Sequence, residues 1–548
     1  YWLVYNGELY NNEPLREEFR GLGHQFRTDH SDTETLLSAC IEWGPACLDK
    51  LNGMFAFVFV DNLAGTVLAA RDRMGIKPFY YRMADGVLTF ASEPKAFLGE
   101  RRADRSQLLG YFHFRQVEGT STFYEGIRKL PAAHYFRMDG EGMPEPRRYW
   151  HPLGSSGHPR DLGDAREVMD LLTEAVDLQM VADVPVGTYL SGGLDSSLIT
   201  ALAARKGRIK TFSIGFRDDV PGNASELAHA ATVARHLGTD HHALAISPAE
   251  YLAAQQRAFQ VLDEPVADSA CGPLLLLSEL ARSQGVVVCL SGEGADELFI
   301  GYRQWHDAYR VQRILERLPS AMARGFAAMG APGLARRKPD WATWVRRHGN
   351  GQQIIWGGID GMSHEDVEQV FNPDFLAGAR DPYASVRPYM DAAEHRGTDL
   401  LQRLSAFDLL FRLPDHLLAR VDRMSMAASL EARVPYLDHR LVERSLRLKL
   451  PLLIGPSGEK LALKEFARKL LPPAIVDRPK VGFLIPMEQV LHASEALKQR
   501  DLILAMDDAL GLYGHAFRED LAQGRITGLR LWPHFALANW WELHVRTA

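Results

Sequence analysis

The pattern of apolar and polar positions divides the chain into two blocks. The first block, residues 1–150, alternates short apolar runs with turns of Asn, Gly and Asp, which is typical of a sheet-rich domain. One helical pattern interrupts these strands at residues 33–43, and Ser31 or Asp32 can cap its first turn. Residues 151–164 are dense in Gly, Pro and Ser, the composition of a linker, so we predict a domain boundary there.

The second block, residues 165–548, follows a different pattern. Helical stretches alternate with short apolar runs, and this alternation predicts a parallel sheet covered by helices. The predicted strands are 184–190, 210–216, 242–246 and 286–290. Beyond about Trp305 the pattern is almost entirely helical. The chain is therefore predicted to combine an α+β domain with an α/β domain that carries a helical C-terminal part.

Size and composition fit a multidomain enzyme. A chain of 548 residues with 46% hydrophobic residues can form two or more full cores. The net charge of -7 comes without a long basic run, which argues against nucleic acid as the main partner. Four scattered cysteines do not suit a disulfide framework or a paired zinc site, which favours the cytoplasm. No stretch approaches the roughly 20 apolar residues of a membrane helix, so no membrane association is expected.

A glycine-rich turn follows the first predicted strand of the second block. It reads Ser191-Gly192-Gly193-Leu194-Asp195-Ser196-Ser197 and leads into a helical run. Its glycines allow the backbone to approach an anion closely, and the helix that follows offers unpaired N–H groups. We predict a phosphate cradle, with an ordinary tight strand-to-helix turn as the alternative. The Gly-Lys-Ser/Thr ending of a Walker A loop is missing, so γ-phosphate transfer is the less expected chemistry.

A second glycine-rich turn, residues 291–297, follows the predicted strand 286–290. Ligands of open α/β sheets bind beyond the carboxyl ends of the strands, so both turns can face one crevice. Asp195 and Asp296 could then share a magnesium ion with phosphate oxygens. For Asp296 and Glu297, acidic capping of a helix start is the alternative.

These turns and further motifs resemble glutamine-dependent asparagine synthetases. The motifs occur in the family's order along nearly the whole chain. In the second block they are the two turns, Val434–His439 and Arg478–Phe483, and in the first block they are Tyr5–Glu8, Ser31–Glu34, Leu51–Phe55 and Ala70–Pro78. The resemblance implies an N-terminal-nucleophile hydrolase αββα sandwich, incomplete here, in residues 1–150. It implies an ATP pyrophosphatase domain, like the adenine nucleotide α-hydrolases, in residues 165–548.

The resemblance implies a glutamine site in the first domain. Asn6 and Gly7 match the oxyanion-hole pair, while Glu8 and Asp32 match carboxylates that hold the ammonium group of glutamine. On local evidence alone, a type I′ hairpin turn is the stronger interpretation of Asn6-Gly7. The family's nucleophile, a cysteine at the mature N-terminus, has no counterpart. Because the chain opens with Tyr1 inside a strand-like run, we expect an N-terminal segment to be missing.

The resemblance also implies an ATP site and its catalytic groups. Glu293 matches the residue that helps ammonia attack, and Arg423 and Lys480 match cations that stabilise charge on phosphate and intermediate. Solvation at the surface is the alternative for both cations. The residues implied to bind ATP are Leu190, Ile214, Ser291 and Gly292 around adenine and ribose, and Ser191, Gly192, Gly193, Leu194, Asp195, Ser196 and Ser197 around pyrophosphate.

The implied activity is an ATP-dependent amide ligation that requires Mg²⁺. The side-chain carboxylate of aspartate would attack the α-phosphorus of ATP to give a β-aspartyl-adenylate and pyrophosphate. Ammonia from glutamine would then displace AMP to give asparagine, in a protein for which a homodimer is a candidate assembly. Two alternatives stay open. One is a ligase of this family that acts on another carboxylate, such as a polysaccharide or secondary-metabolite precursor, and the other is a non-catalytic glutamine-sensing protein.

Overall fold

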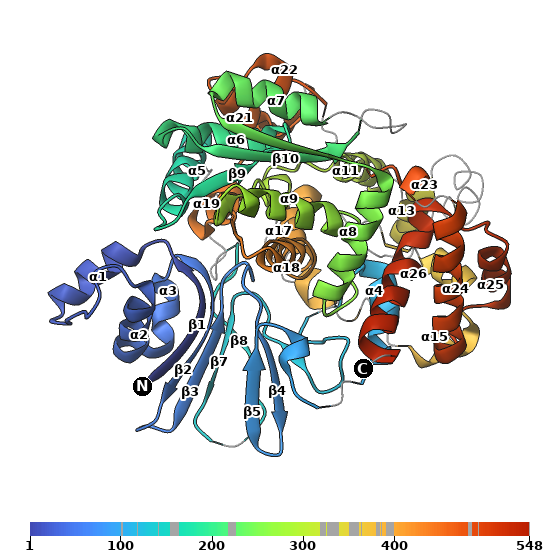
Figure 1. Ribbon diagram of the computed structural model, residues 1–548, viewed down its shortest axis with the longest axis horizontal. Helices are drawn as coiled ribbons and strands as arrows, with labels where there is room; N and C mark the ends of the chain where they lie inside the picture. Colours follow the sequence, from blue (N-terminus) through green and yellow to red (C-terminus); the bar gives the residue numbers. More distant parts are fainter. Residues whose placement is uncertain are drawn as a thin grey trace.

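The computed structural model places a sheet-rich N-terminal domain beneath a second α/β domain, with the C-terminal helices packed at one side (Figure 1). The structure describes residues 1–99, 102–117, 119–140, 142–153, 164–217, 226–317, 325, 339–349, 361–362, 364–379, 384, 386–390, 399–456, 458–479, 485–490 and 493–546. Most of the predicted linker, residues 154–163, lies outside these ranges.

Two antiparallel sheets form the N-terminal domain. The larger sheet has the order β1-β2-β3-β7-β8 and the smaller one the order β5-β4-β6. The strands of the larger sheet are β1 (Trp2–Leu9), β2 (Gly53–Asp61), β3 (Thr66–Arg71), β7 (His134–Met138) and β8 (Arg147–Arg148), and those of the smaller sheet are β4 (Tyr80–Ala84), β5 (Val87–Ala91) and β6 (Arg128–Lys129).

Alternate side chains of β2 pack on opposite faces of the larger sheet. Ala56 and Val58 pack against the smaller sheet, in one core with Tyr81. The intervening Phe55 and Phe57 point to the opposite face, where helices cover them. These helices are α1 (Asn12–Gly21), α2 (Asp32–Trp43) and α3 (Cys47–Lys50). The predicted two-sheet architecture and the predicted helix at 33–43 are confirmed, and the described residues supply one outer layer of helices.

The second domain is built on a parallel sheet with the order β11-β10-β9-β12-β13. Its strands are β9 (Val186–Tyr189), β10 (Lys210–Phe216), β11 (Asp240–Ile246), β12 (Val288–Leu290) and β13 (Glu431–Arg433). Four of them match the predicted strands. The fifth, β13, was not predicted because its Glu-Ala-Arg sequence has no apolar pattern.

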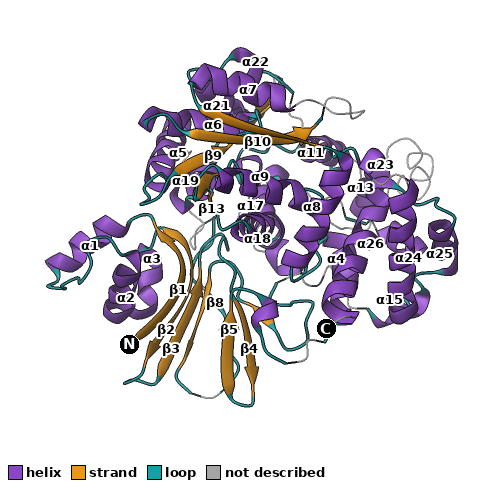
Figure 2. Ribbon diagram, viewed as in Figure 1, coloured by secondary structure: helices purple, strands orange, loops and turns teal. Residues whose placement is uncertain are grey.

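Helices cover both faces of this sheet, as parallel sheets require (Figure 2). One face packs against α5 (Ala165–Gln179), α6 (Leu194–Ala203) and α7 (Glu226–Leu237). The other face packs against α8 (Pro248–Val261), α9 (Cys271–Ser283) and α18 (Ala419–Ala427). The sheet therefore has only its strand ends free for a ligand.

The C-terminal part is mainly helical, as predicted. Beyond Trp305 the described residues also contain β13 and a short hairpin of β14 (Ile454–Gly455) and β15 (Gly458–Glu459). The main C-terminal helices are α24 (Ala493–Leu510), α25 (His515–Ala522) and α26 (Gly528–Trp541). They contact α4 (Leu108–Phe114), where the Tyr111 hydroxyl donates to the Pro533 carbonyl at 2.8 Å.

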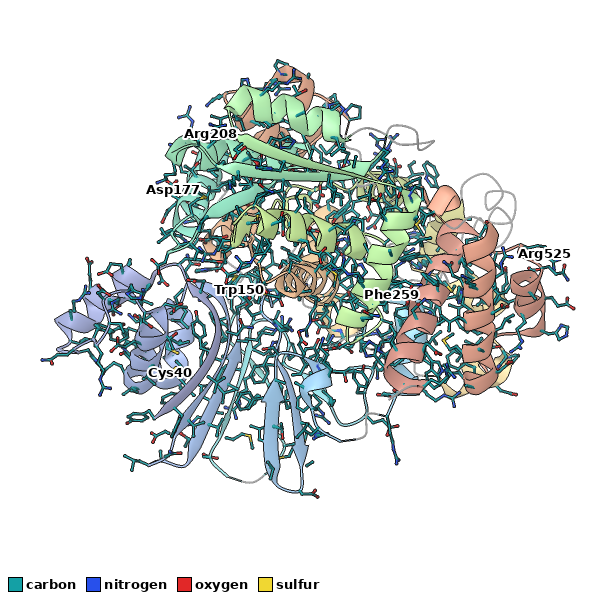
Figure 3. All side chains as sticks on the ribbon, viewed as in Figure 1. Cys40, Trp150, Asp177, Arg208, Phe259 and Arg525 are labelled. Atoms are coloured by element: carbon teal, nitrogen blue, oxygen red, sulfur yellow. The ribbon has the colours of Figure 1, made fainter. Side chains whose placement is uncertain are left out.

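Buried polar pairs join the two domains. Lys77 Nζ lies 3.1 Å from an Asp422 oxygen, and both side chains are less than a tenth exposed. The Trp150 indole, at the junction of the domains (Figure 3), donates to Glu443 at 2.7 Å. Since an ion pair and a side-chain hydrogen bond cross between the domains, the interface fixes their relative position.

We expect Lys77→Met to destabilise the protein by about 3–5 kcal/mol, because it leaves the Asp422 carboxylate buried without its cation. Thermal or denaturant unfolding measures the loss. Lys206→Met is the matched control, because its partner Asp177 is 3.2 Å away and both side chains are more than a third exposed. That exposed pair should contribute less than about 1 kcal/mol. Equal unfolding midpoints for Lys77→Met and Lys206→Met would contradict the stabilising role of the Lys77–Asp422 pair.

Candidate active site

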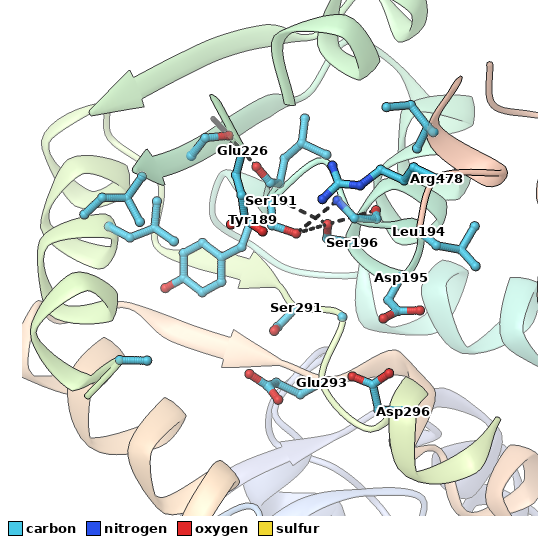
Figure 4. A pocket seen from close by; sticks show the side chains of 18 of the residues that line it. Tyr189, Ser191, Leu194, Asp195, Ser196, Glu226, Ser291, Glu293, Asp296 and Arg478 are labelled. Carbon is cyan, nitrogen blue, oxygen red and sulfur yellow. Dashed lines mark hydrogen bonds between the residues drawn. The ribbon is translucent and has the colours of Figure 1, made fainter. Parts of the chain in front are cut away.

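A cavity of about 340 Å³ lies at the carboxyl ends of β9, β10 and β12. Both glycine-rich turns contribute to its wall, as expected for turns that follow the carboxyl ends of parallel strands. Figure 4 shows the two turns facing each other across it. Among the predicted ATP-binding residues, the cavity is lined by Leu190, Ser191, Gly193, Leu194, Asp195, Ser196, Ile214, Ser291 and Gly292. Gly192 and Ser197 are not in its wall, and the Ser197 side chain is fully buried in α6.

The first turn is fixed by its own serines. Ser191 Oγ and Ser196 Oγ lie 2.9 Å apart, and the Gly193 N–H donates to Ser191 Oγ at 3.2 Å. Gly192 has a φ of +74°, and a Cβ there would lie 2.5 Å from the Ala230 backbone nitrogen. The turn therefore needs glycine for both conformation and space, and it leads directly into the N-terminus of α6.

One side of the cavity is apolar. Phe212 and Ile214 of β10 face Leu274 and Leu277 of α9 across it. An apolar slot of this kind suits an aromatic base, while the first turn suits the phosphates attached to it.

The two predicted metal ligands are brought together, but around a lysine. Lys460 Nζ lies 2.6 Å from Asp195 Oδ2 and 2.5 Å from Asp296 Oδ1. Burial alone would lower the pKa of Lys460, but the two carboxylates raise it above its ordinary value. Gly301 makes room for this cluster, since a Cβ there would lie 2.0 Å from Asp296 Oδ1. The lysine is thus a buried cation at the edge of the predicted phosphate site.

Lys460 was not predicted from the sequence. It precedes α21 (Leu461–Ala467) and adopts a φ of +55°, which is unusual for a residue other than glycine. A backbone conformation of this kind is often retained at functional sites. No local sequence pattern marks it.

The carboxylates of Asp195 and Asp296 fit a divalent ion that takes its other ligands from a nucleotide, although they do not form a complete metal site by themselves. Within the described part of the chain, no group of three or more His, Cys, Asp and Glu side chains could hold a metal ion. Asp195 and Asp296 supply two carboxylates within reach of one cation, and Mg²⁺ commonly takes its remaining ligands from phosphate and water.

Glu293 lies in the cavity wall, where an arginine holds it. Arg420 Nη2 donates to Glu293 Oε1 at 2.8 Å, and Arg420 Nη1 donates to Asp268 Oδ2 at 2.6 Å. Burial raises the pKa of the Glu293 carboxyl, and Arg420 opposes that shift. A carboxylate with a raised pKa is a better proton acceptor than an exposed one.

The structure does not bring Arg423 to this cavity. Its guanidinium binds the Ser92 carbonyl at 2.6 Å and Glu93 Oε1 at 2.8 Å, in the interface between the domains. Arg420, one turn earlier on α18, is the arginine that faces the cavity. Lys480 lies outside the described residues, so its role stays a prediction.

Four further charged residues of the described chain line the cavity and were not among the predicted site residues: Glu226, Glu459, Lys464 and Arg478. Arg478 Nη1 donates to the Gly192 carbonyl at 3.2 Å, which places a cation beside the first turn. Glu226, at the start of α7, also lines the cavity. Burial raises the pKa of Glu226 to about 7, and Arg478 opposes the shift.

The Asn6-Gly7 pair lies inside strand β1, so the hairpin-turn interpretation is wrong. Gly7 pairs with Phe55 of β2 and has a φ of +154°. A Cβ on Gly7 would lie 2.0 Å from the Met54 carbonyl oxygen. Only glycine allows the two backbones to approach so closely.

Of the predicted glutamine-binding carboxylates, Glu8 belongs to this strand and Asp32 lies beside it. Asp32 Oδ2 accepts from the Tyr5 hydroxyl at 2.9 Å and from the Leu9 N–H at 3.1 Å. Glu8 Oε1 lies 3.3 Å from Arg433 Nη2. Burial raises the pKa of Glu8 to about 7, which Arg433 opposes and Asp32 reinforces. Asp32 thus contacts strand residues on either side of Glu8, which brings the two carboxylates to one stretch of β1.

All four cysteines are free and buried. Cys40 and Cys47 belong to the core between the helices and the larger sheet, where Cys40 is labelled in Figure 3. They are packed away from solvent and do not offer an exposed thiol. No helix of the described residues is both long and apolar enough to span a membrane.

Comparisons with known proteins agree with this architecture. The profile of the Asparagine synthase family matches residues 167–542, and that of the Glutamine amidotransferase domain matches residues 1–150. Asparagine synthetase [glutamine-hydrolyzing] 3 of Bacillus subtilis is 32% identical, with 99% of this chain and 87% of that protein covered. Asparagine synthetase [glutamine-hydrolyzing] 1 of the same organism is 30% identical, covering 90% and 77%. With two profiles that together span both domains, and relatives aligned along nearly its whole length, the chain belongs to the asparagine synthase family.

Proposed function

We propose that this protein is an ATP-dependent amide ligase that makes asparagine from aspartate, with ammonia supplied by glutamine. The observation that carries the proposal is the single cavity at the strand ends, which combines an anion cradle, the Lys460 cation and the Glu293 carboxylate. In the proposed reaction, aspartate and ATP give a β-aspartyl-adenylate and pyrophosphate. Ammonia then attacks the adenylate, and AMP leaves.

The geometry supports ATP binding across the cavity. The apolar slot between β10 and α9 takes the adenine ring, and the first turn with the N-terminus of α6 takes the phosphates. Arg478, beside the Gly192 carbonyl, adds positive charge on the same side. The α-phosphorus then lies between the first turn and the second, toward Lys460.

Charge stabilisation is the main task of the protein in the first step. A cation that is already desolvated and fixed stabilises developing negative charge without reorganisation. Lys460 meets both conditions, because it is 3% exposed and is held by two carboxylates. Mg²⁺, held by Asp195 and Asp296 with the nucleotide, would supply further neutralisation of phosphate charge.

The second step requires a proton acceptor near the acyl carbon. Glu293 lies in the same wall as Asp296, and its carboxylate faces the cavity (Figure 4). Its raised pKa suits it to take a proton from the attacking ammonia nitrogen.

The N-terminal domain is proposed to supply the ammonia. Glu8 and Asp32 would hold the ammonium group of glutamine, and Asn6 with the Gly7 N–H would stabilise the oxyanion formed when its amide is attacked. The buried, free cysteines are consistent with a reducing cytoplasmic setting.

Pyrophosphate release tests the proposal. ATP should give AMP and pyrophosphate only when aspartate is present, within a panel that includes other amino acids with side-chain carboxylates and sugar carboxylates. Release with a different acid and not with aspartate would retain the ligase but replace its acceptor. No release with any acid would contradict the proposal.

We expect Lys460→Met to lower kcat for pyrophosphate formation by about 100-fold or more, because a fixed cation that serves the transition state is lost. Stopped-assay measurement of kcat and KM separates this effect from weaker binding. Lys469→Met is the control, because that exposed lysine lies in the same segment but outside the cavity wall. An increase in KM for ATP at unchanged kcat would show that Lys460 only anchors the ground state.

A polypeptide of residues 1–548 should make the amide from free ammonia but not from glutamine. Activation of an amide requires a nucleophile, and the four cysteines of these residues are all buried. A preceding segment that begins with cysteine should restore the use of glutamine, and Asp32→Asn should then raise KM for glutamine without affecting ammonia-dependent synthesis. Glutamine hydrolysis by residues 1–548, free of contaminating glutaminase, would refute the assignment.

A further inference from the structure

A chain of four side chains leads away from Glu293 into the protein. Arg420 bridges Glu293 and Asp268 with its two terminal nitrogens, at 2.8 and 2.6 Å. His416 Nε2 then lies 3.3 Å from the same Asp268 oxygen that Arg420 contacts. The other Asp268 oxygen accepts from the Ala270 N–H at 2.8 Å. Each oxygen of Asp268 is therefore occupied, and the carboxylate is held in one orientation.

The three supporting side chains are nearly sealed from solvent. The side chains of Arg420, Asp268 and His416 are each only 11–12% exposed. Arg420 lowers the pKa of Asp268 against the effect of burial, with help from His416. Burial lowers the pKa of His416, and the neighbouring Asp268 opposes that shift; Nε2 is the ring nitrogen that faces Asp268. Its Nδ1 is buried and has no hydrogen-bond partner among the described residues.

The backbone is specialised at this point. His416 lies in a π-helix, Leu413–Leu418, that runs directly into α18 and so into Arg420. π-Helical turns are rare and occur often at functional sites. Here the wider turn presents His416 and Arg420 to Asp268 from consecutive stretches of one helix.

The charges of Arg420 and Asp268 affect how readily Glu293 accepts a proton. An arginine that contacted Glu293 alone would place its whole positive field on that carboxylate and make it a poorer proton acceptor. Asp268 shares the guanidinium, which leaves Glu293 oriented but less strongly neutralised. Packing alone does not require this arrangement, because a buried charged pair is costly to retain.

We propose that Asp268 and His416 are positioning residues for the amide-forming step, acting through Arg420 to orient Glu293 and to keep it basic. The inference rests on the proposed function, in which Glu293 is the catalytic proton acceptor. In that step the ammonia nitrogen forms a bond to the acyl carbon while the bond from that carbon to the AMP oxygen breaks. One proton of the nitrogen passes to Glu293, and AMP leaves with the electron pair of the broken bond.

The test measures adenylate formation and amide formation separately. Aspartate is used as the acceptor acid. Exchange of labelled pyrophosphate into ATP reports adenylate formation, and amide formation from ammonia reports the complete reaction. Asp268→Asn should lower kcat for amide formation by about tenfold to a hundredfold, a partial loss of the roughly 10²–10⁴-fold that acid–base assistance contributes. Pyrophosphate exchange should stay within about threefold of the parent, since this step does not use Glu293.

A histidine pair of variants gives a second measurement. His416→Gln keeps a side-chain donor and should retain most of the activity, whereas His416→Leu should show the same selective loss as Asp268→Asn. Hydroxylamine, a stronger nucleophile than ammonia, should be affected less than ammonia in both deficient variants. Asp507→Asn is the control, because Asp507 is a buried acid paired with Arg518 among the C-terminal helices. It should not separate the two half-reactions.

Glu293→Gln distinguishes failure of this inference from failure of the proposed function. If Glu293→Gln selectively lowers amide formation and Asp268→Asn does not, the positioning role is overturned and the base is retained. If Glu293→Gln has no selective effect, the base assignment fails and the inference fails with it. Equal loss of both half-reactions in Asp268→Asn, with no rescue in His416→Gln, would show that Arg420, Asp268 and His416 have only a structural role.

Discussion

The ammonium of Lys460, enclosed by two carboxylates, is the interaction on which the site depends. Parallel strands β9 and β12 bring the two glycine-rich turns to one edge of the sheet, and with them Asp195 and Asp296. Two partly buried carboxylates so close together repel each other unless a cation lies between them. Lys460 supplies that charge from a distant part of the chain and joins the helical C-terminal part to the sheet. The two carboxylates outnumber the single ammonium, so this cluster keeps capacity for a further cation that arrives with a phosphate.

Several contacts between the two domains involve residues of, or close to, the motifs identified in the sequence. Asn52 of the first domain donates to Asp438 of the second at 3.0 Å, and Lys77 pairs with Asp422. Glu8, a proposed glutamine ligand, contacts Arg433 at the end of β13. The Lys77–Asp422 pair lies close to Arg420 on α18, and the Glu8–Arg433 pair includes a proposed glutamine ligand. The domain interface can therefore hold the glutamine side and the nucleotide side of the protein in a fixed relation.

The features that could be predicted from the sequence are those formed by residues that are contiguous in the chain. A glycine-rich turn after an apolar strand is visible in the sequence, so the convergence of the two turns on one cavity was predicted. Lys460 and Arg420 were missed because the role of a cation depends on tertiary placement, and a helix turn separates Arg420 from the predicted Arg423. Strand β13 was missed because its register is set by pairing with β12 and not by apolar side chains. Asn6-Gly7 fits a hairpin locally, but tertiary pairing with β2 extends it into a strand.

The central claim is that this cavity activates a carboxylate as an adenylate. The most direct measurement uses aspartate labelled with oxygen-18 in its side-chain carboxylate, turned over with ATP and ammonia, followed by mass spectrometry of the nucleotide and phosphate products. The account predicts that one labelled oxygen appears in AMP, with unlabelled pyrophosphate. Label in inorganic phosphate, with ADP as the nucleotide product, would show activation through an acyl phosphate and would contradict the account.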